Sequence, residues 1–164
     1  MKNLLEIDNV KIRFRTKGML KAVIDRDKDP YIEAVCGASL TIKQGETFAL
    51  VGESGAGKTT LARSIIGLVT PSQGSIRYQD QELMGLDDKA FKPLKRDIAM
   101  MFQDPVGCLS PRLSVRSIIT EPFKIHGLPI NDVSKEATKL LDMVGLPASF
   151  LTPFPYQLSG GQAR

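Results

Sequence analysis

The sequence predicts an α/β fold, a sheet-forming first part followed by a helical second part. A continuous apolar run, 47–51, leads through a glycine-rich loop into an amphipathic stretch that begins at residue 58. Residues 9–14 alternate between apolar and polar side chains, which is typical of a strand with one buried face. Beyond residue 103 the spacing of apolar residues becomes helical. Together these patterns predict strands, then a loop and helix, then a helical segment.

The composition of the chain limits the classes of protein to which it can belong. The chain has 164 residues, 42% hydrophobic and 24% charged, which suits one globular domain or slightly less. No apolar run approaches the roughly 18 residues of a membrane span, and charges come too early for a secretory signal. Cys36 and Cys108 match no metal or redox spacing, so a reduced, cytoplasmic setting is expected. The net charge of +4 leaves binding of a polyanion possible, but the basic residues are scattered and charge alone does not indicate such a partner. No nucleic-acid partner is expected.

The first part contains the expected strands. Val10, Ile12 and Phe14 lie on one side of the strand over 9–14. Residues 15–31 are rich in Lys and Arg without a clean period, and they predict a loop insertion or loose hairpin. A second strand is expected over 34–42, a turn over 43–46, and a central strand buried on both faces over 47–51.

The elements that follow the glycine loop are predicted from periodicity. A helix is expected over 58–69, a strand between two turns over 70–83, and a second buried strand over 97–102. Two further helices are expected over 114–127 and 131–146, each ended by a glycine, Gly127 and Gly145. The second of these has an apolar face of Val133, Ala137, Leu140, Leu141 and Val144.

The loop "GESGAGKTT" (52–60) fits the pattern G-x-x-x-x-G-K-[ST]. Backbone N–H groups must turn inward to surround phosphates, and side chains there would block the approach. A lysine reaches the β- and γ-phosphates, and the following hydroxyl ligates Mg²⁺. The alternative is a glycine turn that merely starts a helix, but the strand before it and the helix after it favour a mononucleotide site. Its predicted residues are Gly52, Ser54, Gly55, Ala56, Gly57, Lys58, Thr59 and Thr60.

Near the end of the sequence, "LSGGQ" (158–162) resembles the signature of the ATP-binding cassette (ABC) superfamily. The order Lys58, Gln103, Ser159 also fits that superfamily. The stretches "MFQDPVGCLSPRLSVRSIITEPFKIHG" and "PYQLSGGQAR" resemble ATPase subunits of bacterial oligopeptide, dipeptide and nickel importers. Cys108 and Ser110 depart mildly from the usual form of that group.

The resemblance implies a P-loop NTPase (ABC ATPase) core with an antiparallel β edge and an inserted helical subdomain. The expected division is a nucleotide-binding core over 1–106, a helical subdomain over 107–157, and the signature with the start of its helix over 158–164. The cofactors implied are ATP and Mg²⁺. Lys58 and Gln103 would act in catalysis, and Thr59 and Gln103 would contact the metal ion.

Two further groups of residues follow from the resemblance. Phe14 would stack on adenine, with Tyr31 as a weaker rival. Ser159, Gly160, Gly161 and Gln162 would bind the γ-phosphate of ATP held by a second subunit. His126 precedes the signature and is not expected to be the family's switch histidine. Asp104 is set aside as an ordinary part of the segment after Gln103.

The function implied is that of an ATP-hydrolysing subunit for import of peptide-like solutes or nickel. Its partners would be a second ABC ATPase subunit, membrane permease subunits and, indirectly, an extracytoplasmic solute-binding protein. It would be peripheral, at the cytoplasmic face of the inner membrane. Because the family's Walker B aspartate, catalytic glutamate and switch histidine have no counterpart here, the chain is expected to be part of a longer ATPase. Two alternatives stay open: a nucleotide-binding module without catalysis, and a non-transport ABC ATPase acting on nucleic acid.

Overall fold

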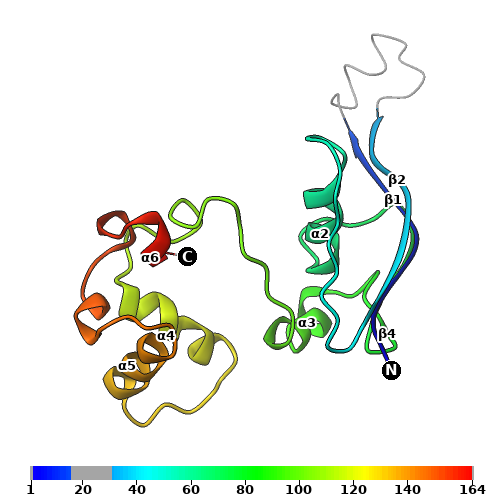
Figure 1. The fold of residues 1–164 in the computed structure, drawn as a ribbon. Helices are drawn as coiled ribbons and strands as arrows, with labels where there is room; N and C mark the ends of the chain where they lie inside the picture. The colour runs from blue at the N-terminus through cyan, green and yellow to red at the C-terminus, as the bar shows by residue number, and fades with distance from the viewer. Residues whose placement is uncertain (1, 16–30, 164) are drawn as a thin grey trace. The chain divides into compact units, whose positions relative to one another are not determined.

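The computed structural model describes residues 2–15 and 31–163 (Figure 1), and the predicted insertion over 15–31 lies almost wholly outside them. The chain divides into two compact units, Met1–Ala99 and Met100–Arg164. None of the described helices is long and apolar enough to cross a membrane. Each unit is built around its own elements.

The first unit contains an antiparallel sheet with the strand order β2-β1-β3-β4. The predicted strands over 9–14 and 34–42 are confirmed, and both lie within longer strands. The strand expected within 70–83 is also confirmed, as a short hairpin. The strands are β1 (Asn3–Arg15), β2 (Tyr31–Lys43), β3 (Gln73–Tyr78) and β4 (Gln81–Glu82).

A bulge in β1 keeps apolar side chains on the core face. Val10 and Ile12 are fully buried, and Ile7 is 3% exposed. Strict alternation from Ile7 would turn Asn9 inward. Instead the pairing with β2 shifts between Ile7 and Val10, and Asn9 adopts a φ of 45°. Asn tolerates this left-handed conformation better than most residues, so the extra residue is accommodated there.

The core of the first unit lies between the sheet and the segments that follow the glycine loop. The helix α2 (Lys58–Ile65) lies along the sheet (Figure 1), and α3 (Asp88–Phe91) and the 3₁₀ turn η1 (Leu94–Arg96) follow. The helix predicted over 58–69 is confirmed but shorter, because Gly67 turns left-handed at φ 75° against the Phe91 ring. The buried members of the core are Leu5, Ile7, Val10, Ile12, Val35, Leu61, Ile76, Leu83 and Phe91.

Two strand predictions were wrong. Neither 47–51 nor 97–102 is a strand in the structure, and Val51 and Met101 are 88% and 64% exposed. The apolar runs were interpreted as strands buried on both faces, and such strands need hydrogen-bonded neighbours on each side. Within the described part of the chain, every strand pairing is made by β1 to β4. The two segments therefore lie outside the sheet.

The second unit contains the two predicted helices, α4 (Val115–Ile125) and α5 (Val133–Met143). Ser114 and Asp132 cap their N-termini through side-chain oxygens. Gly127 and Gly145 follow the helix ends at φ 64° and 73°, as expected. The turns η2 (Ala148–Leu151) and η3 (Pro155–Gln157) lead to α6 (Gly160–Ala163).

The apolar face predicted for α5 is only partly correct. Ala137 and Leu141 are buried, at 0% and 3% exposure, and α5 packs there against α4. Val133 and Val144, at the two ends of the predicted stripe, are 41% and 69% exposed. The helix begins at Val133, and Val144 is already its C-cap residue, so neither lies over the buried contact.

Candidate functional site

The glycine loop runs from residue 52 to the first turn of α2, as the motif predicts. Gly55 and Gly57 have φ angles of 85° and 82°, in the left-handed region that favours glycine. A Cβ added at Gly55 would meet nothing within 4 Å, so space for an incoming group is open there. Gly57 is the N-cap residue of α2, and the free N–H groups of this eight-residue helix follow it.

Gly57 is also held against the sheet. A Cβ at this position would lie 2.2 Å from the carbonyl oxygen of Ala34 and 3.1 Å from Cγ2 of Val35. Both contacts belong to β2. The absence of a side chain thus lets the start of α2 approach the backbone of β2, a constraint that the motif alone did not reveal.

Lys58 folds back over the loop that precedes it. Its Nζ donates hydrogen bonds to the carbonyl oxygens of Gly52 and Glu53, at 2.7 and 2.6 Å. The N–H of Ala56 donates to the Glu53 carbonyl at 3.2 Å, which closes the same turn. The ammonium group therefore lies within the loop and ties its two ends together.

The chemistry of the loop fits a phosphate chain with a magnesium ion. Left-handed glycines, a lysine ammonium and a helix N-terminus all favour an anion. No group of three or more His, Cys, Asp or Glu among the described residues could hold a metal ion by itself. Mg²⁺ commonly takes one or two protein ligands and completes its shell with phosphate oxygens and waters. The hydroxyl of Thr59, in the exposed first turn of α2, suits that role.

Phe14 and Tyr31 lie on opposite faces of the β1–β2 ladder. Phe14 is paired with Ile32, and Arg15 with Tyr31, and directly paired residues share a face. The pairing shifts between Ile12 and Arg13, but the extra residue, Ala34, belongs to β2. Alternation along β1 therefore places Phe14 on the face of Ile12, which belongs to the same buried cluster as Leu61 of α2. The two aromatic side chains are 45% and 46% exposed. Phe14 is therefore on the face that carries α2, and Tyr31 is on the other.

Next to Phe14, Arg13 and Glu33 form an ion pair across the two strands. The Arg13 Nε donates to Glu33 Oε1 at 2.7 Å, and the guanidinium Nη2 contacts the same oxygen. The hydrogen bond and the charge of Arg13 hold the pKa of the Glu33 carboxyl below its ordinary value. The pair is solvent-exposed, so its contribution to stability is small.

Gln103 lies in the second unit, exposed, and the turn 105–108 begins two residues after it. The Oδ1 of Asp104 accepts a hydrogen bond from the Gly107 N–H at 2.9 Å. Neither Asp104 nor Gly107 is among the site residues that the sequence predicts. The signal was present in the sequence, since D-P-V-G places Asp, Pro and Gly where a type I turn favours them.

The signature residues form a capped helix start, also in the second unit. The Ser159 N–H donates to Gln162 Oε1 at 2.8 Å, and the Gln162 N–H donates to Ser159 Oγ at 3.3 Å. This reciprocal pair is a capping box, with Ser159 at the start of α6. Gly160 and Gly161 are exposed, and a Cβ at either would meet nothing within 4 Å. The four residues are thus brought together in one open turn.

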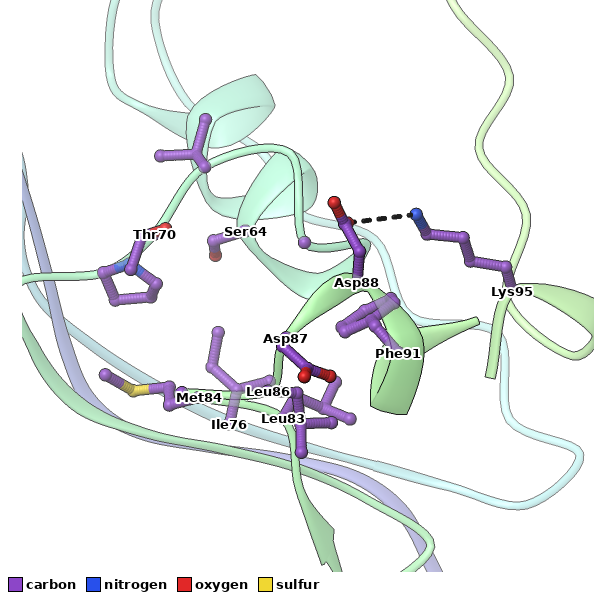
Figure 2. Close-up of a pocket in the computed structure, with 14 residues that line it drawn as sticks. Ser64, Thr70, Ile76, Leu83, Met84, Leu86, Asp87, Asp88, Phe91 and Lys95 are labelled. Carbon is purple, nitrogen blue, oxygen red and sulfur yellow. Dashed lines mark ion pairs between the residues drawn. The ribbon is translucent and has the colours of Figure 1, made fainter. Parts of the chain in front are cut away.

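A separate cavity of about 190 Å³ lies in the first unit, near the C-terminal end of α2 (Figure 2). Its lining includes the buried residues Ile76, Leu83 and Phe91. Lys95 Nζ lies 3.9 Å from Asp88 Oδ1 at its side. None of the loop residues 52–60 lines this cavity, so it is not the candidate phosphate site.

Comparison with known proteins identifies relatives over nearly the whole chain. The profile of the family described as ABC transporter matches residues 35–164. The oligopeptide transport ATP-binding protein AppF of Bacillus subtilis is 37% identical over 163 residues, which cover 98% of this chain and 48% of AppF. The oligopeptide transport ATP-binding protein OppF of Escherichia coli is 35% identical over 165 residues, covering 99% and 49%. The chain spans about half the length of these relatives.

Solved structures give the same result for the fold. A dimeric ATP-binding cassette in a post-hydrolysis state, bound to ADP and Pi, matches with a TM-score of 0.79 at 27% identity. The match covers 98% of this chain and 65% of that one. The α/β ABC ATPase fold expected from the sequence is therefore confirmed, although two of its strands are not formed in the described residues.

Proposed function

The chain belongs to the ABC transporter family, and from that membership we propose that the intact protein is the ATP-binding subunit of an importer of peptide-like solutes. ATP hydrolysis would power uptake across the bacterial inner membrane. The observation that carries the proposal is the phosphate loop, with left-handed Gly55 and Gly57 and Lys58 at the start of α2. The substrate class is supported by the relatives AppF and OppF, which are named as oligopeptide transport proteins. Nickel is the second candidate substrate within the same group.

Each group of residues in the proposed nucleotide site has its own role. Backbone N–H groups of residues 52–60 surround the phosphates, with Gly52, Ser54, Ala56 and Thr60 completing the loop. Lys58 leaves the carbonyl oxygens of Gly52 and Glu53 and contacts the β- and γ-phosphates instead. Thr59 would hold Mg²⁺, which would neutralise charge on the phosphate oxygens. Phe14 stacks on adenine, because it shares the sheet face that carries α2 and Tyr31 does not.

Hydrolysis is proposed to need a second ATPase subunit. Ser159, Gly160, Gly161 and Gln162 supply a hydroxyl, bare backbone and a helix start to ATP held on the partner subunit. The dimeric cassette among the solved structures supports a paired arrangement. Gln103 would orient the attacking water or contact Mg²⁺. Its position would change with the presence of the γ-phosphate, and this change would be transmitted to the helical subdomain. The further partners proposed are membrane permease subunits and, indirectly, a solute-binding protein, with this subunit at the cytoplasmic face.

Loss of the Lys58 ammonium tests the proposal. In the intact protein, Lys58→Ala is expected to weaken ATP binding and to abolish ATP-driven uptake of a labelled oligopeptide into membrane vesicles. Lys89→Ala is the matched control, because Lys89 is an exposed lysine of α3 outside the loop. Unchanged hydrolysis and uptake in Lys58→Ala would refute the proposal. ATP binding without hydrolysis in the wild type would favour a binding module instead.

A further inference from the structure

The segment directly after Gln103 is closed by one of its own side chains. The carboxylate of Asp104 accepts the Gly107 N–H through Oδ1 at 2.9 Å. Between these two residues, Pro105 fixes its own φ near about −65° and removes a donor. The chain thus leaves Gln103 into a turn with little backbone freedom.

Gly107 leaves space for the Asp104 carboxylate in its present position. Its φ lies outside the left-handed region, so backbone freedom does not explain the glycine. A Cβ at Gly107 would lie 2.1 Å from Oδ2 of Asp104 and 2.8 Å from its Cγ. The carboxylate therefore occupies the place of the missing side chain. One oxygen bonds the Gly107 N–H, and the other lies against its Cα.

We propose that Asp104 and Gly107 are positioning residues for Gln103, and this rests on the proposed function. Asp104 is the next residue in the chain, so closing its turn restrains the backbone immediately after Gln103. With the turn closed, the backbone next to the exposed Gln103 has fewer conformations, so its amide has fewer positions to sample. A misplacement of about 1 Å in a group that orients a reactant can cost about 100-fold in rate. The turn is proposed to act on hydrolysis through Gln103.

Steady-state hydrolysis by the intact ATPase, assembled with its permease, tests this role. Asp104→Ala removes the acceptor, and kcat is expected to fall about 10-fold with KM for ATP nearly unchanged. Asp104→Asn keeps an oxygen for the Gly107 N–H and is expected to retain most of the activity. Asp142→Ala, at an exposed aspartate of α5, is the matched control and leaves kcat unchanged.

Two double variants separate positioning from general damage. In a Gln103→Ala background, Asp104→Ala is expected to add no further loss, because the residue through which it acts is gone. Gly107→Ala alone drives a methyl group into the carboxylate and is expected to reduce kcat. Adding Asp104→Ala removes the colliding group, so the double variant returns to the level of Asp104→Ala alone.

The outcomes distinguish this inference from the proposed function. Wild-type kcat in Asp104→Ala, an equal loss in Asp104→Asn, or additive losses in the Gln103→Ala background would each overturn the positioning role. In those cases hydrolysis that depends on Lys58 would leave the proposed function intact. A wild-type protein without Lys58-dependent hydrolysis would overturn both.

Discussion

Gly57 meets two steric demands at once, and they can be separated by experiment. Its φ of 82° disfavours any residue with a Cβ, and the Ala34 carbonyl oxygen occupies the place that a Cβ would take. Gly55 shares the first demand, at φ 85°, but not the second. The two neighbouring glycines therefore form a matched pair.

Gly57→Ala is expected to destabilise the first unit more than Gly55→Ala. The left-handed conformation costs an alanine about 1 to 2 kcal/mol, which is the whole expected effect at Gly55. At Gly57 the backbone of β2 must also shift, and we expect a total of about 2 to 4 kcal/mol. Hydrogen exchange of buried β1 amides in the intact protein measures both. Equal effects of the two substitutions would contradict the close approach of Gly57 to β2.

Glu82 anchors the β3–β4 hairpin through several donors. Its carboxylate accepts hydrogen bonds from the Ile76 and Met84 N–H groups, each at 3.0 Å, and a short one from the Ser75 hydroxyl. Burial raises the pKa of the Glu82 carboxyl. The hydrogen bonds and the nearby Arg77 lower this pKa by more than burial raises it, so it lies below the ordinary value of 4.5.

The sign of the pH dependence follows from this direction. A lowered folded-state pKa means that the ionised carboxylate stabilises the fold above the ordinary pKa, and that this contribution is lost as pH falls through the folded-state pKa. Glu82→Gln is therefore expected to flatten the acid side of the stability profile, measured by hydrogen exchange of the β3 amides. Glu121→Gln, at an exposed glutamate of α4, controls for the loss of one carboxylate. A profile that Glu82→Gln leaves unchanged would contradict the assignment.

Helix starts in the second unit depend on side-chain caps. Asp132 Oδ1 accepts the N–H groups of Ser134 and Lys135, at 2.9 and 3.0 Å, at the start of α5. Ser159 and Gln162 do the same reciprocally at α6. Such caps depend on residues within one turn, which is why the one at Ser159 could be predicted from the sequence.

A single substitution at Asp132 removes the N-terminal cap of α5. Asp132→Ala leaves two N–H groups without their acceptor and is expected to cost α5 about 1 kcal/mol. Asp142→Ala, near the other end of the same helix, removes a negative charge where it is unfavourable and should cost nothing. Hydrogen exchange of the first-turn amides of α5 measures the difference. Faster exchange in Asp142→Ala than in Asp132→Ala would contradict it.

The segment 47–51 is apolar in composition but exposed in the structure. Phe48, Leu50 and Val51 are 43%, 46% and 88% exposed, although the segment has the composition of a buried strand. Short apolar segments of high β-propensity that remain unpaired favour association with other chains. The described residues supply this segment with no strand to pair with.

The chain of 164 residues is therefore expected to self-associate when it is made alone. Light scattering and binding of a hydrophobic dye would measure this. Val51→Thr should reduce both signals, since it keeps the side-chain shape and lowers the apolar exposure. Val133→Thr, at a half-exposed valine of α5, is the control. A chain that stays monomeric and binds no dye would contradict the expectation.

The sequence by itself determined the features that depend on neighbours along the chain. These features follow from spacing within a few residues: the glycine loop at the start of a helix, the strands around Val10 and Ile12, the two long helices with their terminal glycines, and the Ser159 cap. Together with the signature, they were enough to identify the family. The roles assigned to Gln103, Phe14 and the signature residues stay predictions.

Only the tertiary structure decided what depends on contacts between distant segments. The approach of Gly57 to Ala34, the bulge at Asn9 and the opposite faces of Phe14 and Tyr31 depend on how strands pair. The same holds for the absence of strands at 47–51 and 97–102 from the described residues. An apolar run indicates that a segment favours burial. Whether it becomes a strand depends on a hydrogen-bonded neighbour, which local sequence does not encode.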